Sequence, residues 1–272
     1  MKRTLPLLLS IATITIALAG CGTASPGAGG SRAASSGSGA GGSRAASGGS
    51  GAGGSGSGVA PQGGAGSAGA GGAVVKGDST AAVFRGSIAT GRDTVRKRMR
   101  YSWRPGCPAG PVELRLLLVD YWGFDGRVHR GELIVHRDHA RRILVVFGKL
   151  FKARCPVRRL RPVDAYRADD DRSMAANNTS GFNCRRVSGS SSWSEHAFGR
   201  AIDLNPLRNP YVTQGGWVSP PAGRPYANRA RRAAGMIHGG DTVVRAFAAA
   251  GWRWGGNWSG SRDYQHFSAT GR

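Results

Sequence analysis

The chain has 272 residues and a formal net charge of +23, with 38 Lys and Arg against 15 Asp and Glu. Such an excess of positive charge attracts polyanions, but no recognisable nucleic-acid motif accompanies it, which argues against a nucleic-acid-binding protein. The apolar stretch near the N-terminus is too short to span a bilayer comfortably, which argues against a membrane-spanning helix there.

The first twenty residues are typical of an export signal. Met1-Lys2-Arg3 is basic, residues 5–17 are apolar, and Leu18-Ala19-Gly20-Cys21 has the bacterial lipobox pattern. We therefore expect cleavage before Cys21, diacylglyceryl attachment to its sulfur, and a mature protein that its acyl chains anchor to the cell membrane, facing the cell wall. The alternative is an ordinary secretory signal followed by an incidental cysteine.

Residues 21–78 are predicted to be a flexible, disordered linker behind the lipidated cysteine. They are almost wholly Gly, Ser and Ala, and the heptapeptide Gly-Gly-Ser-Arg-Ala-Ala-Ser occurs at 29–35 and again at 41–47. Such a composition builds no core and behaves as a random coil. The linker is either a spacer that reaches into the cell wall or a low-complexity sequence whose length has drifted without selection.

Residues 79–272 are long enough for one domain with a proper core, and we expect a monomer. Loss of Lys2 and Arg3 with the signal would lower the net charge from +23 to +21. Outside a cell, the polyanions available to such a surface are anionic wall polymers and phospholipid headgroups. The alternative is that the basic residues only keep the protein soluble.

The folded part is predicted to have a helix, a hairpin and a second helix in that order. Residues 83–99 are expected to begin with a helix, and residues 114–121 and 131–136 are expected to form strands around a turn at 123–126. After Asp138, apolar residues repeat at helical spacing, which predicts a helix. Asp138 can cap this helix, and it stops before Pro156. This order predicts an α+β fold with a small, mostly antiparallel sheet packed against helices.

Further along, residues 156–166 are predicted to form a strand, and residues 169–171, three consecutive aspartates, an exposed acidic loop. Asp241 and Gly251 mark the start and the end of a further helix near the C-terminus. Between the strand and this helix, residues 205–238 are rich in Pro, Gly and Arg, and we interpret them either as a flap beside a cleft or as a surface excursion. Trp252, Trp254 and Trp258 are either core residues or a wall of that cleft.

The strongest chemical signal comes from two short stretches. Residues 194–203 read Ser-Glu-His-Ala-Phe-Gly-Arg-Ala-Ile-Asp, and residues 263–267 read Asp-Tyr-Gln-His-Phe. Two imidazoles and a carboxylate are three ligands that zinc accepts, and they leave a fourth position for water. If residues 199–204 are extended, Asp203 faces the site while Ile202 and Leu204 face the core. A buried histidine paired with an aspartate is commonplace, so the prediction depends on the joint pattern.

This joint pattern resembles the D-Ala-D-Ala carboxypeptidase family of zinc peptidases. Ser-x-His-x-x-Gly-x-Ala-x-Asp, followed by an acidic residue, two spacers and His-Phe, is similar to the metal motif of VanY-like enzymes and of phage L-alanyl-D-glutamate endopeptidases. The resemblance covers roughly residues 130–266. It implies the fold and metal site that this family shares with the hedgehog N-terminal domain.

The resemblance also implies residue roles. The zinc (Zn2+) ligands fall on His196, Asp203 and His266, and the catalytic acid/base falls on Asp263, where the best-known members carry Glu. Residues 180–185 resemble the segment that places a substrate-orienting arginine, here Arg185. As substrate contacts we further expect Ser194, Asn183 and Trp254.

The implied reaction is hydrolysis of a stem peptide of peptidoglycan, with water activated by zinc and deprotonated by Asp263. The bond cleaved is either D-Ala-D-Ala or L-Ala-D-Glu. One alternative is a cell-wall-binding lipoprotein that keeps the fold without turnover, because Asp263 is shorter than Glu. Another is a polyanion-binding protein, whose binding would depend steeply on salt and not on a chelator.

Three cysteines remain besides Cys21, namely Cys107, Cys155 and Cys184. An exported protein can form disulfides, so we expect one bridge and one free thiol. Three pairings are possible, of which we favour Cys107 with Cys184. No Cys-x-x-Cys spacing supports a structural zinc.

Overall fold

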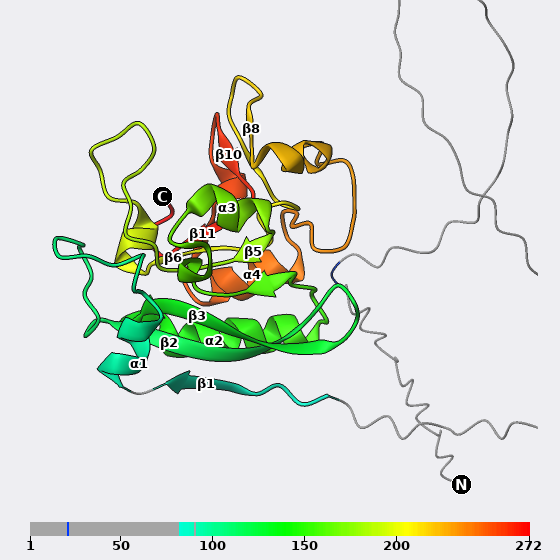
Figure 1. The fold of residues 1–272 in the computed structure, drawn as a ribbon. Helices are drawn as coiled ribbons and strands as arrows, with labels where there is room; N and C mark the ends of the chain where they lie inside the picture. The colour runs from blue at the N-terminus through cyan, green and yellow to red at the C-terminus, as the bar shows by residue number, and fades with distance from the viewer. Residues whose placement is uncertain (1–20, 22–81, 90) are drawn as a thin grey trace, which may run out of the picture. The chain divides into compact units, whose positions relative to one another are not determined.

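A three-stranded antiparallel sheet underlies the first half of the folded chain. The computed structural model describes Cys21, residues 82–89 and residues 91–272 (Figure 1), so the predicted signal peptide and all of the predicted linker except Cys21 lie outside the described residues. The strands are β1 (Gly86–Ala89), β2 (Leu114–Trp122) and β3 (Val128–His136), in the order β1-β2-β3. Both predicted strands of the hairpin are confirmed, whereas residues 83–99 begin with β1 rather than with a helix.

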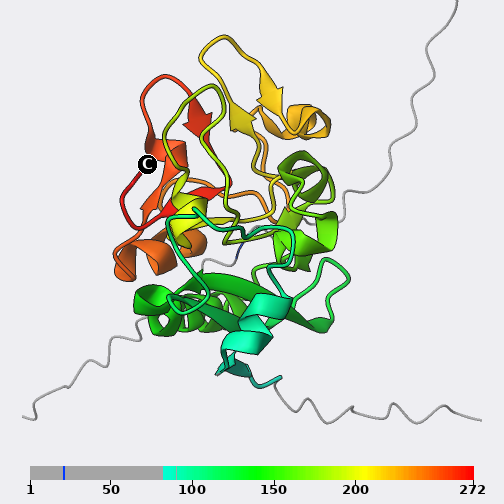
Figure 2. The same ribbon diagram turned by 60° about the vertical axis from the view of Figure 1, so that its left-hand side comes forward.

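The two faces of this sheet bury different cores. Leu117 and Leu133 pair across β2 and β3 and face the helix α2 (Arg137–Lys152), because side chains alternate along a strand. Leu116 and Ile134 pair on the opposite face, where they pack with Val95 of the short helix α1 (Arg92–Lys97). Figure 2 shows α1 beside this sheet. The sheet is therefore covered on both sides.

Helix α2 follows its predicted course, but its cap differs from the prediction. The His136 side chain accepts a hydrogen bond from the backbone N–H of Asp138 at 3.3 Å, so His136 is the N-cap. Asp138 lies in the first turn, where a carboxylate stabilises the helix by its interaction with the helix dipole.

A second three-stranded sheet carries the C-terminal part of the chain. Its strands are β6 (Ala201–Asp203), β11 (His266–Ser268) and β9 (Arg253–Trp254), in the order β6-β11-β9. Helix α4 (Thr242–Ala249) begins as predicted, with Asp241 accepting a hydrogen bond from the N–H of Val244 at 3.0 Å. Phe247 of α4 stacks on Phe267 of β11 with ring centroids 4.0 Å apart, which joins this sheet to the core around α2.

The remaining elements are short. A third sheet, in the order β10-β7-β8, is made of β7 (Tyr211–Val212), β8 (Val218–Ser219) and β10 (Arg262–Asp263), and β4 (Arg159–Leu160) pairs in parallel with β5 (Asn178–Thr179). The other helical turns are η1 (Val163–Tyr166), α3 (Asp170–Ala175), η2 (Glu195–Phe198), η3 (Pro221–Tyr226) and η4 (Gly255–Asn257).

Two predictions about this part of the chain therefore need correction. The strand expected at 156–166 is limited to the two residues of β4, because η1 begins at Val163. The aspartates at 169–171 are not a loop: Asp169 accepts a hydrogen bond from the N–H of Arg172 at 2.9 Å and so caps α3. Residues 205–238 contain the β7–β8 hairpin and η3, and their contact with substrate stays a prediction.

All four cysteines form disulfides. The favoured pair Cys107–Cys184 is confirmed, but the expected free thiol is not found, because Cys155 is bonded to Cys21. One sulfur cannot hold both a disulfide and a diacylglyceryl thioether, so the structure differs from the lipidation prediction at this atom.

Mixed helices and small, mostly antiparallel sheets agree with the predicted α+β class. Within the described ranges, 82–89 and 91–272, no helix is both long enough and apolar enough to cross a membrane.

Candidate metal centre

The pairing of β6 with β11 places two of the predicted ligands opposite each other. His266 pairs with Asp203, and Phe267 pairs with Ile202. Because side chains alternate, Asp203 and His266 share one face, while Ile202 and Phe267 turn into the core, where both are 0% exposed. The short strands thus hold a carboxylate and an imidazole side by side.

The helical turn η2 supplies the third predicted ligand, His196. Ser194 caps η2 by accepting a hydrogen bond from the N–H of His196 at 3.3 Å. Gly199 ends the turn in the left-handed conformation, with φ of 67°. A Cβ on Gly199 would lie 2.7 Å from the backbone nitrogen of His136, so η2 can approach β3 this closely only with glycine there.

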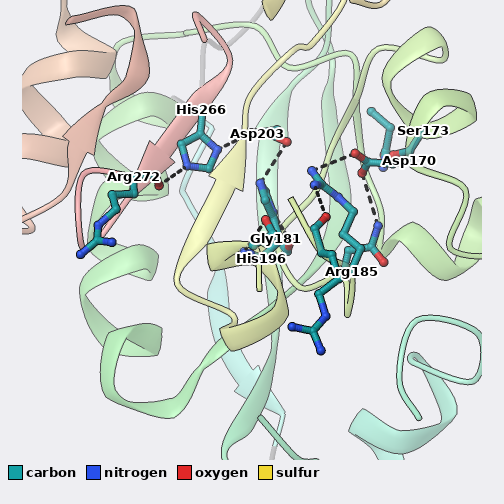
Figure 3. Close-up of polar contacts among 12 residues, drawn as sticks. Asp170, Ser173, Gly181, Arg185, His196, Asp203, His266 and Arg272 are labelled. Atoms are coloured by element: carbon teal, nitrogen blue, oxygen red, sulfur yellow. Dashed lines mark hydrogen bonds and ion pairs between the residues drawn. The ribbon is translucent and has the colours of Figure 1, made fainter. Parts of the chain in front are cut away.

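His196, Asp203 and His266 converge in a buried group (Figure 3). Asp203 lies 3.1 Å from His196 Nε2 through Oδ2 and 3.1 Å from His266 Nδ1 through Oδ1. Ligand atoms held tetrahedrally at about 2.0–2.1 Å from a zinc ion lie roughly 3.3 Å apart. The observed spacing is close to that value, and one potential ligand atom from each residue lies within 4.8 Å of the others.

The outer nitrogens of both imidazoles are bound to main-chain oxygens. His196 Nδ1 lies 2.6 Å from the oxygen of Gly181, and His266 Nε2 lies 2.9 Å from the oxygen of Arg272. Main-chain oxygens only accept, so each outer nitrogen carries the proton, and in a neutral ring the inner nitrogen then has a free lone pair. Histidines that bind metals are oriented in the same way.

One inner nitrogen has no hydrogen-bond partner in the part of the chain that the structure describes. His196 Nε2 is buried, and its 3.1 Å approach to Asp203 lacks hydrogen-bond geometry. A buried nitrogen without a partner is costly in a protein interior, and a metal ion bound at this point would satisfy it. Two imidazoles and a carboxylate also form a donor set that zinc accepts, so the residues fit such an ion.

The electrostatics of the group favour an anionic Asp203. Burial disfavours its charge, but His196 and His266 outweigh this and hold the pKa of Asp203 well below its usual range. Burial lowers the pKa of His266, but its bond to Asp203 and the negative charges nearby raise that pKa to about 9. In the metal-free protein His266 is therefore a cation at neutral pH.

Asp263, the predicted base, lies in β10 and interacts electrostatically with the group. Burial and the negative charge of Asp203 raise the pKa of Asp263 to about 6. Its Oδ1 is buried and has no hydrogen-bond partner among the described residues. A carboxylate with a raised pKa and an unengaged oxygen is suited to accept a proton.

Arg185 lies on a segment that runs along η2. Asn183 N–H donates to His196 O at 3.1 Å, and Ser194 N–H donates to Arg185 O at 3.1 Å. The guanidinium of Arg185 pairs with Asp170 at 2.9 Å, and Figure 3 draws this pair together with the imidazoles. Sequence reasoning missed Asp170, although the capping aspartate before it is a signal for a helix start.

Three predicted substrate contacts have other partners in the structure. Ser194 caps η2, and the Asn183 side chain donates to Asp170 at 3.3 Å. Trp254 is only 6% exposed and belongs to the core, with its indole N–H donating to Tyr264 O, and its contact with substrate stays a prediction. Trp258 is the tryptophan beside the site, with its ring 5.5 Å from that of His266.

Replacing Gly199 by Ala should destabilise the metal-free protein by about 2–4 kcal/mol, because a left-handed alanine and a clash with the β3 backbone add together. Urea unfolding measures the change. Gly189→Ala is the matched control, since Gly189 has φ of 73° but no atom within 4 Å of the position that a Cβ would take. Equal losses of unfolding free energy in the two variants would mean that the close approach of η2 to β3 does not determine the cost of the Gly199 substitution.

Metal binding at pH 7 should release about one proton, because His266 must lose its proton to become a ligand. Since its bond to Asp203 and the negative charges nearby raise the pKa of His266 to about 9, the release should fade as the pH rises through 9, and the affinity should rise over the same range. Calorimetry in buffers of different ionisation enthalpy counts the protons. A release that does not change between pH 7 and pH 10 would contradict this assignment.

Comparison with known proteins agrees with the geometry. No curated protein and no solved structure matches the chain significantly. Residues 188–269, which include His196, Asp203, Asp263 and His266, match a family model described as D-alanyl-D-alanine carboxypeptidase. This match supports a place for the C-terminal part of the chain in that peptidase family.

Proposed function

We propose that the protein is a zinc-dependent peptidase that hydrolyses the stem peptides of peptidoglycan. The observation that carries the proposal is that both outer imidazole nitrogens are bound to main-chain oxygens, which turns His196 Nε2 and His266 Nδ1 toward one carboxylate, Asp203. The family match over residues 188–269 supports peptide hydrolysis as the reaction.

His196, Asp203 and His266 would hold the zinc ion, which would supply a Lewis acid for the attacking water and the scissile carbonyl. Asp263 accepts the proton of the attacking water on its unengaged oxygen, Oδ1, and passes it to the leaving amine. Arg185, held by Asp170, offsets negative charge on the carbonyl oxygen. Asp170 is therefore a positioning residue in this scheme.

The cleaved bond in this proposal is either the terminal D-Ala-D-Ala bond or the internal L-Ala-D-Glu bond. Incubation of the chain with purified peptidoglycan, with mass spectrometry of the products, separates the two. Released alanine indicates a carboxypeptidase, and new amino termini indicate an endopeptidase. If chelator-treated and zinc-restored protein give no difference in products, the peptidase proposal fails and a non-catalytic wall-binding lipoprotein is the better description.

We further propose that the protein is exported and acts at the cell envelope, with two alternative fates for Cys21. Where Cys21 carries the diacylglyceryl group, Cys155 keeps a free thiol and acyl chains hold the protein at the membrane. Where Cys21 is bonded to Cys155, that anchor is absent. Intact mass and thiol counting on protein from the membrane fraction distinguish the two forms, and an uncleaved chain there would contradict both.

A further inference from the structure

A cavity on the α1 side of the first sheet collects positive charge away from the candidate metal centre. It has a volume of about 670 Å³. Its lining includes five cationic side chains but only two acidic ones; the cationic residues are Lys97, Arg98, Arg100, Arg130 and Arg161, and the acidic ones are Glu132 and Asp164. The cavity lining therefore carries an excess of three positive charges.

Both acidic residues are already engaged. Glu132 accepts two hydrogen bonds from Arg98, at 2.6 and 2.9 Å. Asp164 accepts hydrogen bonds from the backbone N–H groups of Tyr101, at 2.7 Å, and Ser102, at 3.1 Å. Arg130 has its own partner outside the lining, Asp120, at 2.8 Å.

Three cations remain without a carboxylate. Among residues 82–89 and 91–272, no acidic oxygen lies within 4.0 Å of the charged groups of Lys97, Arg100 or Arg161. All three residues are exposed. Like charges around one cavity repel each other, and an anion bound among them would relieve that repulsion.

The size and the floor of the cavity indicate the kind of anion. At about 30 Å³ for a water molecule, the volume corresponds to roughly twenty waters, which is far more than one phosphate group needs. Leu118, Leu160 and Pro162 give part of the lining an apolar character. A second cavity of about 650 Å³ adjoins it and shares Lys97 and Arg100. A chain of phosphates joined by short carbon units fits this arrangement better than an isolated ion.

The aromatic residues argue against a nucleic acid. Single-stranded nucleic acids bind where bases stack on open aromatic faces. In the first cavity Tyr101 is the aromatic residue of the lining, and the guanidinium of Arg100 lies over its ring at 5.4 Å. In the second cavity Trp103 is half-buried, with its indole N–H bound to Ala109 O at 3.1 Å.

We propose that Lys97, Arg100 and Arg161 form a binding site for a non-nucleotide phosphodiester polymer of the cell envelope. The site lies close to the Arg185 segment in the fold, because Ser102, bound to Asp164, accepts a hydrogen bond from the N–H of Cys184 at 3.0 Å. A polymer held there would keep the protein in the wall. The proposal does not depend on peptide hydrolysis.

The test is calorimetric titration of the full chain with lipid-free poly(glycerol phosphate) at several salt concentrations. The variant K97Q/R100Q/R161Q should bind at least about tenfold more weakly than wild type, and the slope of log K against log salt should shrink by about two to three. The matched control R141Q/R142Q/K152Q removes the same number of exposed charges from α2 and should bind within about threefold of wild type.

Three results would overturn the proposal: equal losses in the two triple variants, tighter binding of an oligo(dT) with the same number of phosphates, or binding to phosphatidylglycerol vesicles without binding to the polymer. Equal losses of affinity would mean that binding depends on the net charge of the protein and not on these three residues. Circular dichroism shows whether each variant is folded. The rate at which each variant hydrolyses a soluble stem peptide reports separately on the peptidase activity.

Discussion

Replacing Asp203 by Asn is expected to remove bound metal and to lower peptide hydrolysis by about a thousandfold or more. Asp203 faces both inner imidazole nitrogens at 3.1 Å, and an amide supplies neither its negative charge nor its affinity for a divalent ion. Metal content after dialysis, measured by mass spectrometry, and initial rates on a stem peptide check this expectation.

The control for this variant is Asp125→Asn. Asp125 also pairs with a histidine, His129, at 3.0 Å, but on the exposed turn after β2. It should keep both metal and activity. Retention of stoichiometric zinc by the Asp203 variant would mean that the aspartate only orients His196 and His266.

Replacing Asp263 by Asn should lower kcat by about 10²–10⁴ while the metal content stays unchanged, because this change removes the general base and none of the three ligands. Asp263→Glu restores a carboxylate, one methylene longer, and should recover most of the rate. Full activity in the Asn variant would place the base elsewhere.

The same Asn variant should be more stable than wild type in the metal-free state above pH 6. Burial and Asp203 raise the pKa of Asp263 to about 6, so ionising this group costs more in the folded state than in the unfolded state. Wild-type stability should therefore fall as the pH rises from about 4 to about 6, and the Asn variant should lack this loss. Melting temperatures of the metal-free proteins across that range measure the difference.

The predictable part of the fold is the part that local signals determine. Four elements can be recognised from their own residues alone. They are β2 and β3, from their apolar runs, α2, from its helical repeat, and α4, from its Asp241 cap. Strands of two residues, such as β7 and β10, exist only because a distant segment pairs with them, and their sequences carry no period. For the same reason residues 205–238 read as irregular.

The candidate site also has a part that the sequence could predict and a part that it could not. The side chains of His196, Asp203 and His266 could be named from their residue types together with the resemblance to the peptidase family, because zinc accepts few residue types. The groups that orient the two imidazoles are main-chain oxygens of Gly181 and Arg272, and a main-chain oxygen has no residue-type signature. The Cys21–Cys155 bond, across a sequence separation of 134, was equally out of reach of local reasoning.

The contact of Arg272 with His266 has a practical consequence for purification. Residues 269–272 return from β11 to the imidazole, held by a hydrogen bond from the Trp258 indole to Gly271 O at 2.9 Å. An oligohistidine tag fused after Arg272 would start beside the site and offer it competing ligands. Measured zinc stoichiometry and catalytic rates would then report on the tag as well as on the enzyme, so an affinity handle belongs upstream of residue 82.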